Sequence, residues 1–136
     1  MRSGAELASI LCVDDEPSTR ALLVRLLAKN GYRVLQASSA RGALGMVQAE
    51  PELSLILLDL NMQDISGFDA LKVLKGDIRT RLIPVVIVSS TSRPEDVTRA
   101  MELGAYDVVA HPVTDDRVLA AVQRAVGPTG PEPAQA

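Results

Sequence analysis

Short apolar runs alternate along this chain with segments whose apolar residues recur at helical spacing. The clearest runs cover residues 9–13, 53–58, 83–88 and 108–110, and a weaker one covers 32–37. The runs at 53–58 and 83–88 are almost unbroken, without alternation of polar and apolar positions. Such runs are typical of strands that are covered on both faces, as in a parallel sheet between helices. We therefore predict five strands.

Five segments after these runs have apolar residues three or four positions apart, as in an amphipathic helix. The first contains Leu22, Leu23, Leu26 and Leu27. The fourth begins with Ser92 and has Glu95 three residues later, the spacing of a capping box. The helices are predicted to begin near Pro17, at Ser38 or Ser39, before Ala70, at Ser92, and at Thr114 or Asp115. They are predicted to end at Asn30, before Pro51, near Gly76, at Leu103 and near Val126.

The order is strand then helix, five times over. This alternation predicts an α/β fold, with a doubly wound, five-stranded parallel sheet and helices on both faces. We place the domain at residues 7–126. Residues 1–6 are expected to be an N-terminal extension or a cloning remnant. Residues 127–136 contain three prolines and two glycines, which is typical of a linker or a frayed tail.

Composition excludes several classes of function. The net charge is −3, with a pI of about 5.1 and no cluster of lysine and arginine, so direct binding to nucleic acid is not expected. Aromatic residues make up 2% of the chain, which removes the usual stacking platforms for a flavin or for single strands. One cysteine, Cys12, cannot form an intrachain disulfide. With no apolar stretch near ~20 residues and no signal peptide, we expect a cytoplasmic protein without membrane contact.

Polar side chains follow the predicted strands at the edge where ligands bind to open parallel sheets. They are Asp14 and Asp15, Asp59 and Asn61, Ser89, and His111. Acids at such positions often serve only as helix caps, and Asp14 or Asp15 could cap the helix at Pro17. Three converging carboxylates, however, repel one another and require a raised pKa or a cation. Mg²⁺ suits such oxygen ligands, and a carboxylate beside it can act as a nucleophile toward phosphorus.

Short motifs at 13–17, 57–62, 66–68, 83–86 and 103–105, together with Pro112, resemble those of the response-regulator receiver family. The resemblance covers about residues 7–126. It implies a flavodoxin-like (βα)₅ domain of two-component signalling, which takes a phosphoryl group from a sensor histidine kinase, a phosphotransfer protein or a small phosphodonor. A domain of this kind is a signalling module, with only self-directed phosphoryl transfer and hydrolysis, and not an enzyme acting on other substrates.

The resemblance also implies roles for single residues. Asp59 would be the phosphoacceptor and one of the Mg²⁺ ligands. Asp15 would bind the ion directly, and Asp14 directly or through a water. The backbone carbonyl of Asn61 would be a further ligand, while its side chain would influence hydrolysis. Ser89 would be the hydroxyl switch, whose side chain turns inward to the phosphoryl group.

One departure from the family concerns the charge at this site. The family has a lysine where this chain has His111. Histidine is shorter than lysine and titrates near neutral pH. We expect His111 to face the site and replace the lysine in part, which would make phosphorylation or its readout depend on pH near neutrality. The alternative is a histidine that only packs at a strand end.

Two further departures concern the switch and the loop after Asp59. The position of the family's aromatic switch is Val108, and Tyr106 either substitutes for it or anchors the edge of the sheet. Gln63 stands where a proline commonly follows Met62, which is expected to loosen that loop.

These departures keep a second function open. The chain is either a phosphoryl-accepting switch or a pseudo-receiver that binds partners without phosphorylation. An enzyme on a similar fold is disfavoured because the loop after the first strand is acidic, where a phosphate cradle needs glycine and backbone N–H groups. The fourth helix and fifth strand carry mixed charges with Val97 and Met101. That face is either solvated or a surface for an output domain or a second copy.

Overall fold

The computed structural model describes residues 8–50, 52–90 and 93–127, and it contains five strands and five helices in strict alternation. The strands are β1 (Ser9–Val13), β2 (Arg33–Ala37), β3 (Leu55–Leu58), β4 (Val85–Val88) and β5 (Asp107–Val109). The helices are α1 (Pro17–Lys29), α2 (Ala40–Ala49), α3 (Gly67–Gly76), α4 (Pro94–Glu102) and α5 (Asp115–Val126). The predicted α/β class and the five-fold alternation are confirmed.

All strand pairs are parallel, and the strand order is β2-β1-β3-β4-β5. The order reverses between β1 and β3, where consecutive connections leave toward opposite faces. In open α/β sheets such a point leaves a crevice at the carboxyl ends of the strands. Both β3 and β4 are fully buried along their length, which explains their unbroken apolar sequences.

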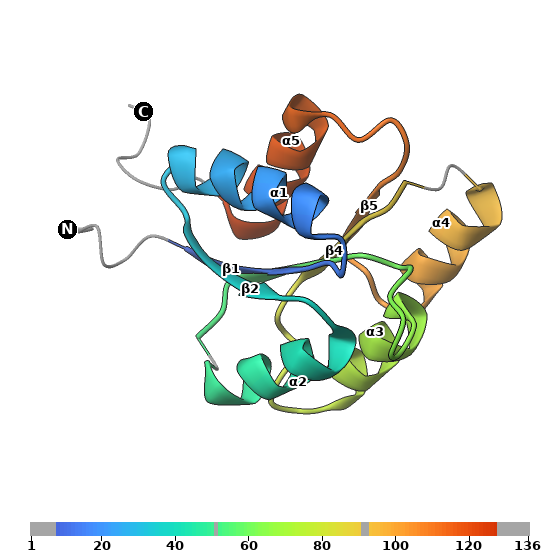
Figure 1. The fold of residues 1–136 in the computed structure, drawn as a ribbon. Coiled ribbons are helices and arrows are strands. Elements are labelled where there is room, and N and C mark those ends of the chain that lie inside the picture. Colours follow the sequence, from blue (N-terminus) through green and yellow to red (C-terminus); the bar gives the residue numbers. More distant parts are fainter. Residues whose placement is uncertain (1–7, 51, 91–92, 128–136) are drawn as a thin grey trace.

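The helices cover the sheet on two faces, with α1 and α5 on one and α2 and α3 on the other (Figure 1). Alternate residues of each strand enter different cores. Cys12 and Leu57 pack with the residues of α1 and α5, whereas Val13 and Leu58 pack with those of α2, α3 and α4. Each core is aliphatic, because only Tyr32 among the aromatic residues is buried. No described helix is both long and apolar enough to cross a membrane.

Several element ends differ from the sequence prediction for local reasons. Strand β4 begins at Val85 and not at residue 83, because Pro84 has no N–H to pair. Tyr32 belongs to the turn after α1, since its N–H bonds the Leu27 carbonyl at 3.2 Å. Strand β5 begins at Asp107, one residue before the apolar run, and ends at Val109. Strand β3 begins at Leu55, two residues after the start of the predicted run at 53–58.

The predicted caps are confirmed for α2 and α5 but not for α4. Ser39 caps α2 and Thr114 caps α5, each accepting a backbone hydrogen bond from the first turn. Helix α3 begins at Gly67, ahead of the apolar stripe that starts at Ala70, and Ser66 caps it. The N-cap of α4 is Arg93, without a side-chain cap, so the capping box is wrong. Ser92, Pro51 and residues 1–7 and 128–136 lie outside the described part, and with them most of the predicted tail.

At the edge of the sheet, the start of β5 is joined to the last turn of α5. The Tyr106 hydroxyl donates to the Arg124 carbonyl at 2.9 Å, and the Arg124 guanidinium forms an ion pair with Asp107. Tyr106 is therefore an anchor of this edge, as one of the two interpretations of the sequence proposed. Val108 packs partly buried against the α2–α4 core.

Candidate functional site

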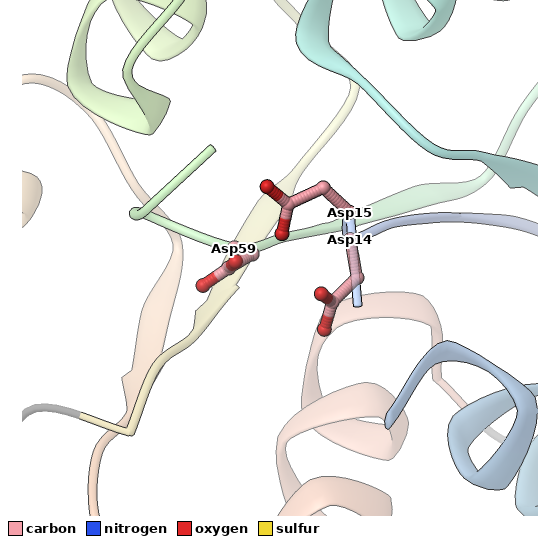
Figure 2. A group of neighbouring side chains, drawn as sticks. All are labelled: Asp14, Asp15 and Asp59. Atoms are coloured by element: carbon pink, nitrogen blue, oxygen red, sulfur yellow. The ribbon is translucent and has the colours of Figure 1, made fainter. Parts of the chain in front are cut away.

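Three aspartates meet at the point where the strand order reverses. Val13 and Leu58 are register partners in β1 and β3, so the next residues, Asp14 and Asp59, lie side by side at the ends of these strands. With Asp15 they offer carboxylate oxygens that all lie within 4.8 Å of one another. Figure 2 shows Asp14 and Asp15 projecting to different sides from adjacent positions, with Asp59 next to both. The predicted convergence is present.

Backbone hydrogen bonds hold the turn that carries Asp14. Its N–H donates to the Ala37 carbonyl at 3.2 Å, and its Oδ1 accepts from the Glu16 N–H at 2.9 Å. Its carbonyl accepts from Arg20 Nη1 at 2.7 Å. The cap of α1 is Glu16, whose carboxylate accepts from Ser18 N–H at 2.8 Å. Because Glu16 caps the helix, the interpretation of Asp14 or Asp15 as the cap is wrong.

Burial and the neighbouring carboxylates change the acidity of Asp59. Burial raises its pKa from 3.8 to about 6, and the charges of Asp14 and Asp15 add to the rise. Hydrogen bonds from the backbone N–H groups of Asn61 and Leu60 oppose it. Burial also raises the pKa of Asp14. The site therefore holds its carboxylates at an electrostatic cost, which a bound cation would relieve.

The backbone behind Asp59 is fixed by close packing. Its N–H bonds the Val13 carbonyl at 3.0 Å. Gly67, the first residue of α3, donates to the Leu60 carbonyl at 2.9 Å and lies so near that a Cβ there would stand 2.5 Å from the Asp59 carbonyl oxygen. Only glycine fits at this approach of helix to strand end.

A cavity of about 440 Å³ opens beside Asp59. It is lined by Asp14, Glu16, Thr19, Leu23, Asp59, Val88, Ser89, Ser90, His111, Pro112 and Val113. Both predicted residues, Ser89 and His111, line this cavity; Ser89 is buried and His111 is exposed. Asp15 and Asn61 are outside the lining, and Asn61 is exposed. Its roles as metal ligand and in hydrolysis, like the other residue roles, stay predictions.

Two arginines near the site were missed by the sequence analysis. Arg20 in α1 holds the Asp14 carbonyl, and Arg117 in α5 donates to the carbonyls of Ala110 and Pro112. One signal could have pointed to them. A cation in the first turns of a helix opposes the helix dipole, so its position there suggests another role.

The loop after Asp59 is anchored by another residue that the sequence analysis did not single out. The carboxylate of Asp64 accepts from the N–H groups of Arg41, at 2.9 Å, and Ala40, at 3.3 Å, at the start of α2. These bonds lower the pKa of Asp64. The loop therefore has an attachment to α2, although Gln63 replaces the family's proline; the expected loosening stays a prediction.

Comparison with known proteins decides the family. The sequence model described as "Response regulator receiver domain" matches residues 10–123. The chain belongs to the response regulator receiver domain family. The receiver is 33% identical over 117 residues to the two-component response regulator ORR3 of rice (Oryza sativa subsp. indica), covering 86% of this chain and 89% of that protein. It is 38% identical over 104 residues to ORR7 of Oryza sativa subsp. japonica, covering 76% of this chain and 50% of ORR7.

Solved structures agree with this assignment of the receiver. Chemotaxis protein CheY4 of Vibrio cholerae has a TM-score of 0.81 at 27% identity, covering 88% of this chain and 98% of that one. The signal receiver domain of a histidine kinase from Syntrophus aciditrophicus has a TM-score of 0.81 at 28% identity, covering 95% and 97%. The predicted family and the flavodoxin-like fold are thus confirmed. The family match lies inside the predicted boundaries 7–126, which stay a prediction. The receiver spans about half the length of ORR7.

Proposed function

We propose that this receiver accepts a phosphoryl group on Asp59 in a reaction that needs Mg²⁺. The observation that carries the proposal is the meeting of Asp14, Asp15 and Asp59 within 4.8 Å at the mouth of a cavity. The side chains of this cluster offer only carboxylate oxygens, which suit a hard cation that keeps several of its waters. Burial raises the pKa of Asp59 first, and the charges of Asp14 and Asp15 add to the rise; a cation beside these carboxylates would favour their ionised forms.

The residues divide into those that hold the ion and the one that reacts. Asp14 and Asp15, with the Asn61 carbonyl as a further ligand, would hold Mg²⁺ beside Asp59. When bound, the ion neutralises the carboxylates and orients the oxygens of the incoming phosphoryl group. The Asp59 carboxylate remains ionised at neutral pH, because its pKa of about 6 lies below 7. It is therefore available as a nucleophile.

The donor is a phosphorylated histidine of a sensor kinase or phosphotransfer protein, or a small phosphoramidate. A carboxylate oxygen of Asp59 forms the new bond to phosphorus while the bond from phosphorus to nitrogen breaks. The nitrogen leaves with the electron pair and takes up a proton. The product is an acyl phosphate beside the cavity that Ser89 and His111 line. The receiver transfers the phosphoryl group only to itself, and it passes the signal on through a bound partner or an output domain.

The test compares three forms of the protein with Mg²⁺ and phosphoramidate, read on a phosphate-affinity gel. The wild type and Glu52→Gln should be labelled, and Asp59→Asn should not. Glu52 is a matched control, because it is an exposed acid that precedes β3 and lies away from the carboxyl edge. Beryllofluoride binding followed by NMR should show the same pattern. A wild type that neither labels nor binds beryllofluoride, or equal labelling of Asp59→Asn, would contradict the proposal and favour a pseudo-receiver.

A further inference from the structure

The loop between β5 and α5 is held by one side chain of α5. Arg117 Nη1 donates to the Ala110 carbonyl at 2.8 Å and to the Pro112 carbonyl at 2.6 Å. These carbonyls flank His111 in the sequence. One nitrogen thus bridges the chain on both sides of the histidine. Pairing of β4 with β5 ends where Ser89 N–H bonds the Val109 carbonyl, so the Ala110 carbonyl is the first one beyond that ladder.

The backbone of Arg117 is fixed as well. Its N–H donates to Thr114 Oγ1 at 3.3 Å, which is the cap of α5. Residues 110–117 therefore form a closed arrangement, bonded at the side chain and at the main chain of Arg117. Helix stability does not explain an arginine here, because the helix dipole favours acids in the first turn, such as Asp115 and Asp116. The hydrogen bonds of Arg117 to the carbonyls of the loop explain its presence.

His111 lies at the same edge of the sheet as Asp59, just beyond the end of β5. Val109 faces the core between α1 and α5, and so does Leu57 in β3. Asp59 and His111 each lie two positions beyond these residues, past the ends of β3 and β5 at the carboxyl edge of the sheet. Both line the cavity, and the described residues that line it include neither lysine nor arginine. Among these lining residues, His111 is the basic side chain. Its ring N–H can donate a hydrogen bond to an anion.

We propose that Arg117 is a positioning residue, which holds the β5–α5 loop so that the His111 ring borders the space beside Asp59. The part that concerns an anion in the cavity rests on the proposed function. The part that concerns the orientation of His111 does not. Removing a side chain that orients a metal ligand typically lowers metal affinity or activity about 10- to 100-fold, and we take the lower end for a group that orients a hydrogen-bond donor. We expect a loss of this size on removing Arg117.

The experiment uses the fact that the chain has a single histidine. Its ring signals in ¹H–¹⁵N spectra are therefore assigned without ambiguity. The wild type, Arg117→Ala, Arg117→Lys and Arg25→Ala are each titrated with beryllofluoride in the presence of Mg²⁺, and their stabilities are measured with urea. Arg25 is the matched control, because it is an exposed arginine of α1 for which the described residues offer no hydrogen bond or ion pair.

In the wild type and Arg25→Ala, beryllofluoride should shift the ring signals of His111. In Arg117→Ala the affinity should fall about 10-fold and the ring shift should shrink, while Arg117→Lys, which can donate to the same carbonyls, should recover part of both. Unchanged affinity with an unchanged ring shift in Arg117→Ala would overturn the proposal. A second result would also overturn it. This is an affinity loss in Arg117→Ala that its lower stability in urea fully explains and that Arg117→Lys does not recover.

Spectra without ligand separate this proposal from the proposed function. A wild type that does not bind beryllofluoride refutes phosphoryl binding, but the orientation of His111 is still decided by relaxation of its ring signals in the free protein. Ring motion should increase in Arg117→Ala and stay as in the wild type in Arg25→Ala. Equal ring motion in all variants would overturn the positioning role.

Discussion

Replacing Asp59 with asparagine should make the ion-free receiver more stable at neutral pH. The pKa of Asp59 is raised in the folded state from 3.8 to about 6, by burial first and then by Asp14 and Asp15. The folded state therefore binds more protons than the unfolded state between these two values. Stability falls as the pH rises through this window, and the full cost of ionisation remains above it. Asparagine has no such cost.

The size of the effect follows from the same numbers. Linkage converts a change from 3.8 to about 6 into an upper bound of about 3 kcal/mol. Asp59 is only partly buried, so solvent screening reduces the expected gain to about 1–2 kcal/mol. The gain should be present at about pH 7.5 and nearly absent at about pH 4, where the folded wild type is already protonated. Saturating Mg²⁺ should reduce it, because the wild type then gains binding energy that the variant lacks.

Urea unfolding followed by far-ultraviolet circular dichroism measures this difference, since the chain has no tryptophan to report by fluorescence. EDTA is present, and the pH is varied from about 4 to 7.5. Glu52→Gln removes an exposed carboxylate elsewhere and should stay within about 0.5 kcal/mol of the wild type. Equal stability of Asp59→Asn and the wild type at neutral pH, or a gain that does not change with pH, would refute the reasoning.

Three further predictions use the same assays. Gly67→Ala should lower the free energy of unfolding by about 2–3 kcal/mol, because its Cβ would lie 2.5 Å from the backbone at the end of β3. Gly45→Ala, which has open space in α2, should raise it by up to about 1 kcal/mol, and the reverse order would contradict the packing argument. Asp64→Asn should lower stability at neutral pH, and the difference should shrink as the pH falls below 3.8, since the Asp64 pKa is lowered by its bond to α2; a difference independent of pH would refute this. His111→Lys should flatten the pH profile of phosphorylation, and a profile shared with the wild type would exclude a histidine effect.

The fold and the aspartate cluster were predictable because they depend on local patterns. Unbroken apolar runs mark buried strands whatever their neighbours, and β3 and β4 show this directly. Polar residues that follow such runs must meet at one edge of a parallel sheet, which is why Asp14 and Asp59 were found from the sequence. Caps such as Ser39 and Thr114 act within one turn and are equally local.

The remaining features depend on contacts between distant segments. The bond from Asp64 to the start of α2 spans 23 residues, and no local pattern distinguishes it from an ordinary turn aspartate. The start of β5 at a polar residue, Asp107, is decided by its partner Val86 in β4 and not by its own hydrophobicity. The role of Arg117 depends on where the loop passes in space. Sequence indicates only that a cation there is unfavourable for the helix.

The two attachments of β5 to α5 have a consequence for how the receiver opens. Tyr106 and Arg124 join the start of the strand to the end of the helix, and Arg117 joins the end of the strand to the start of the helix. Strand and helix are thus tied at both ends, and we expect them to exchange their amide hydrogens as one cooperative unit. Helix α4 begins without a side-chain cap and has only Ala100 fully buried, so its amides should exchange first. Local unfolding would then begin at α4 and leave the β5–α5 unit intact.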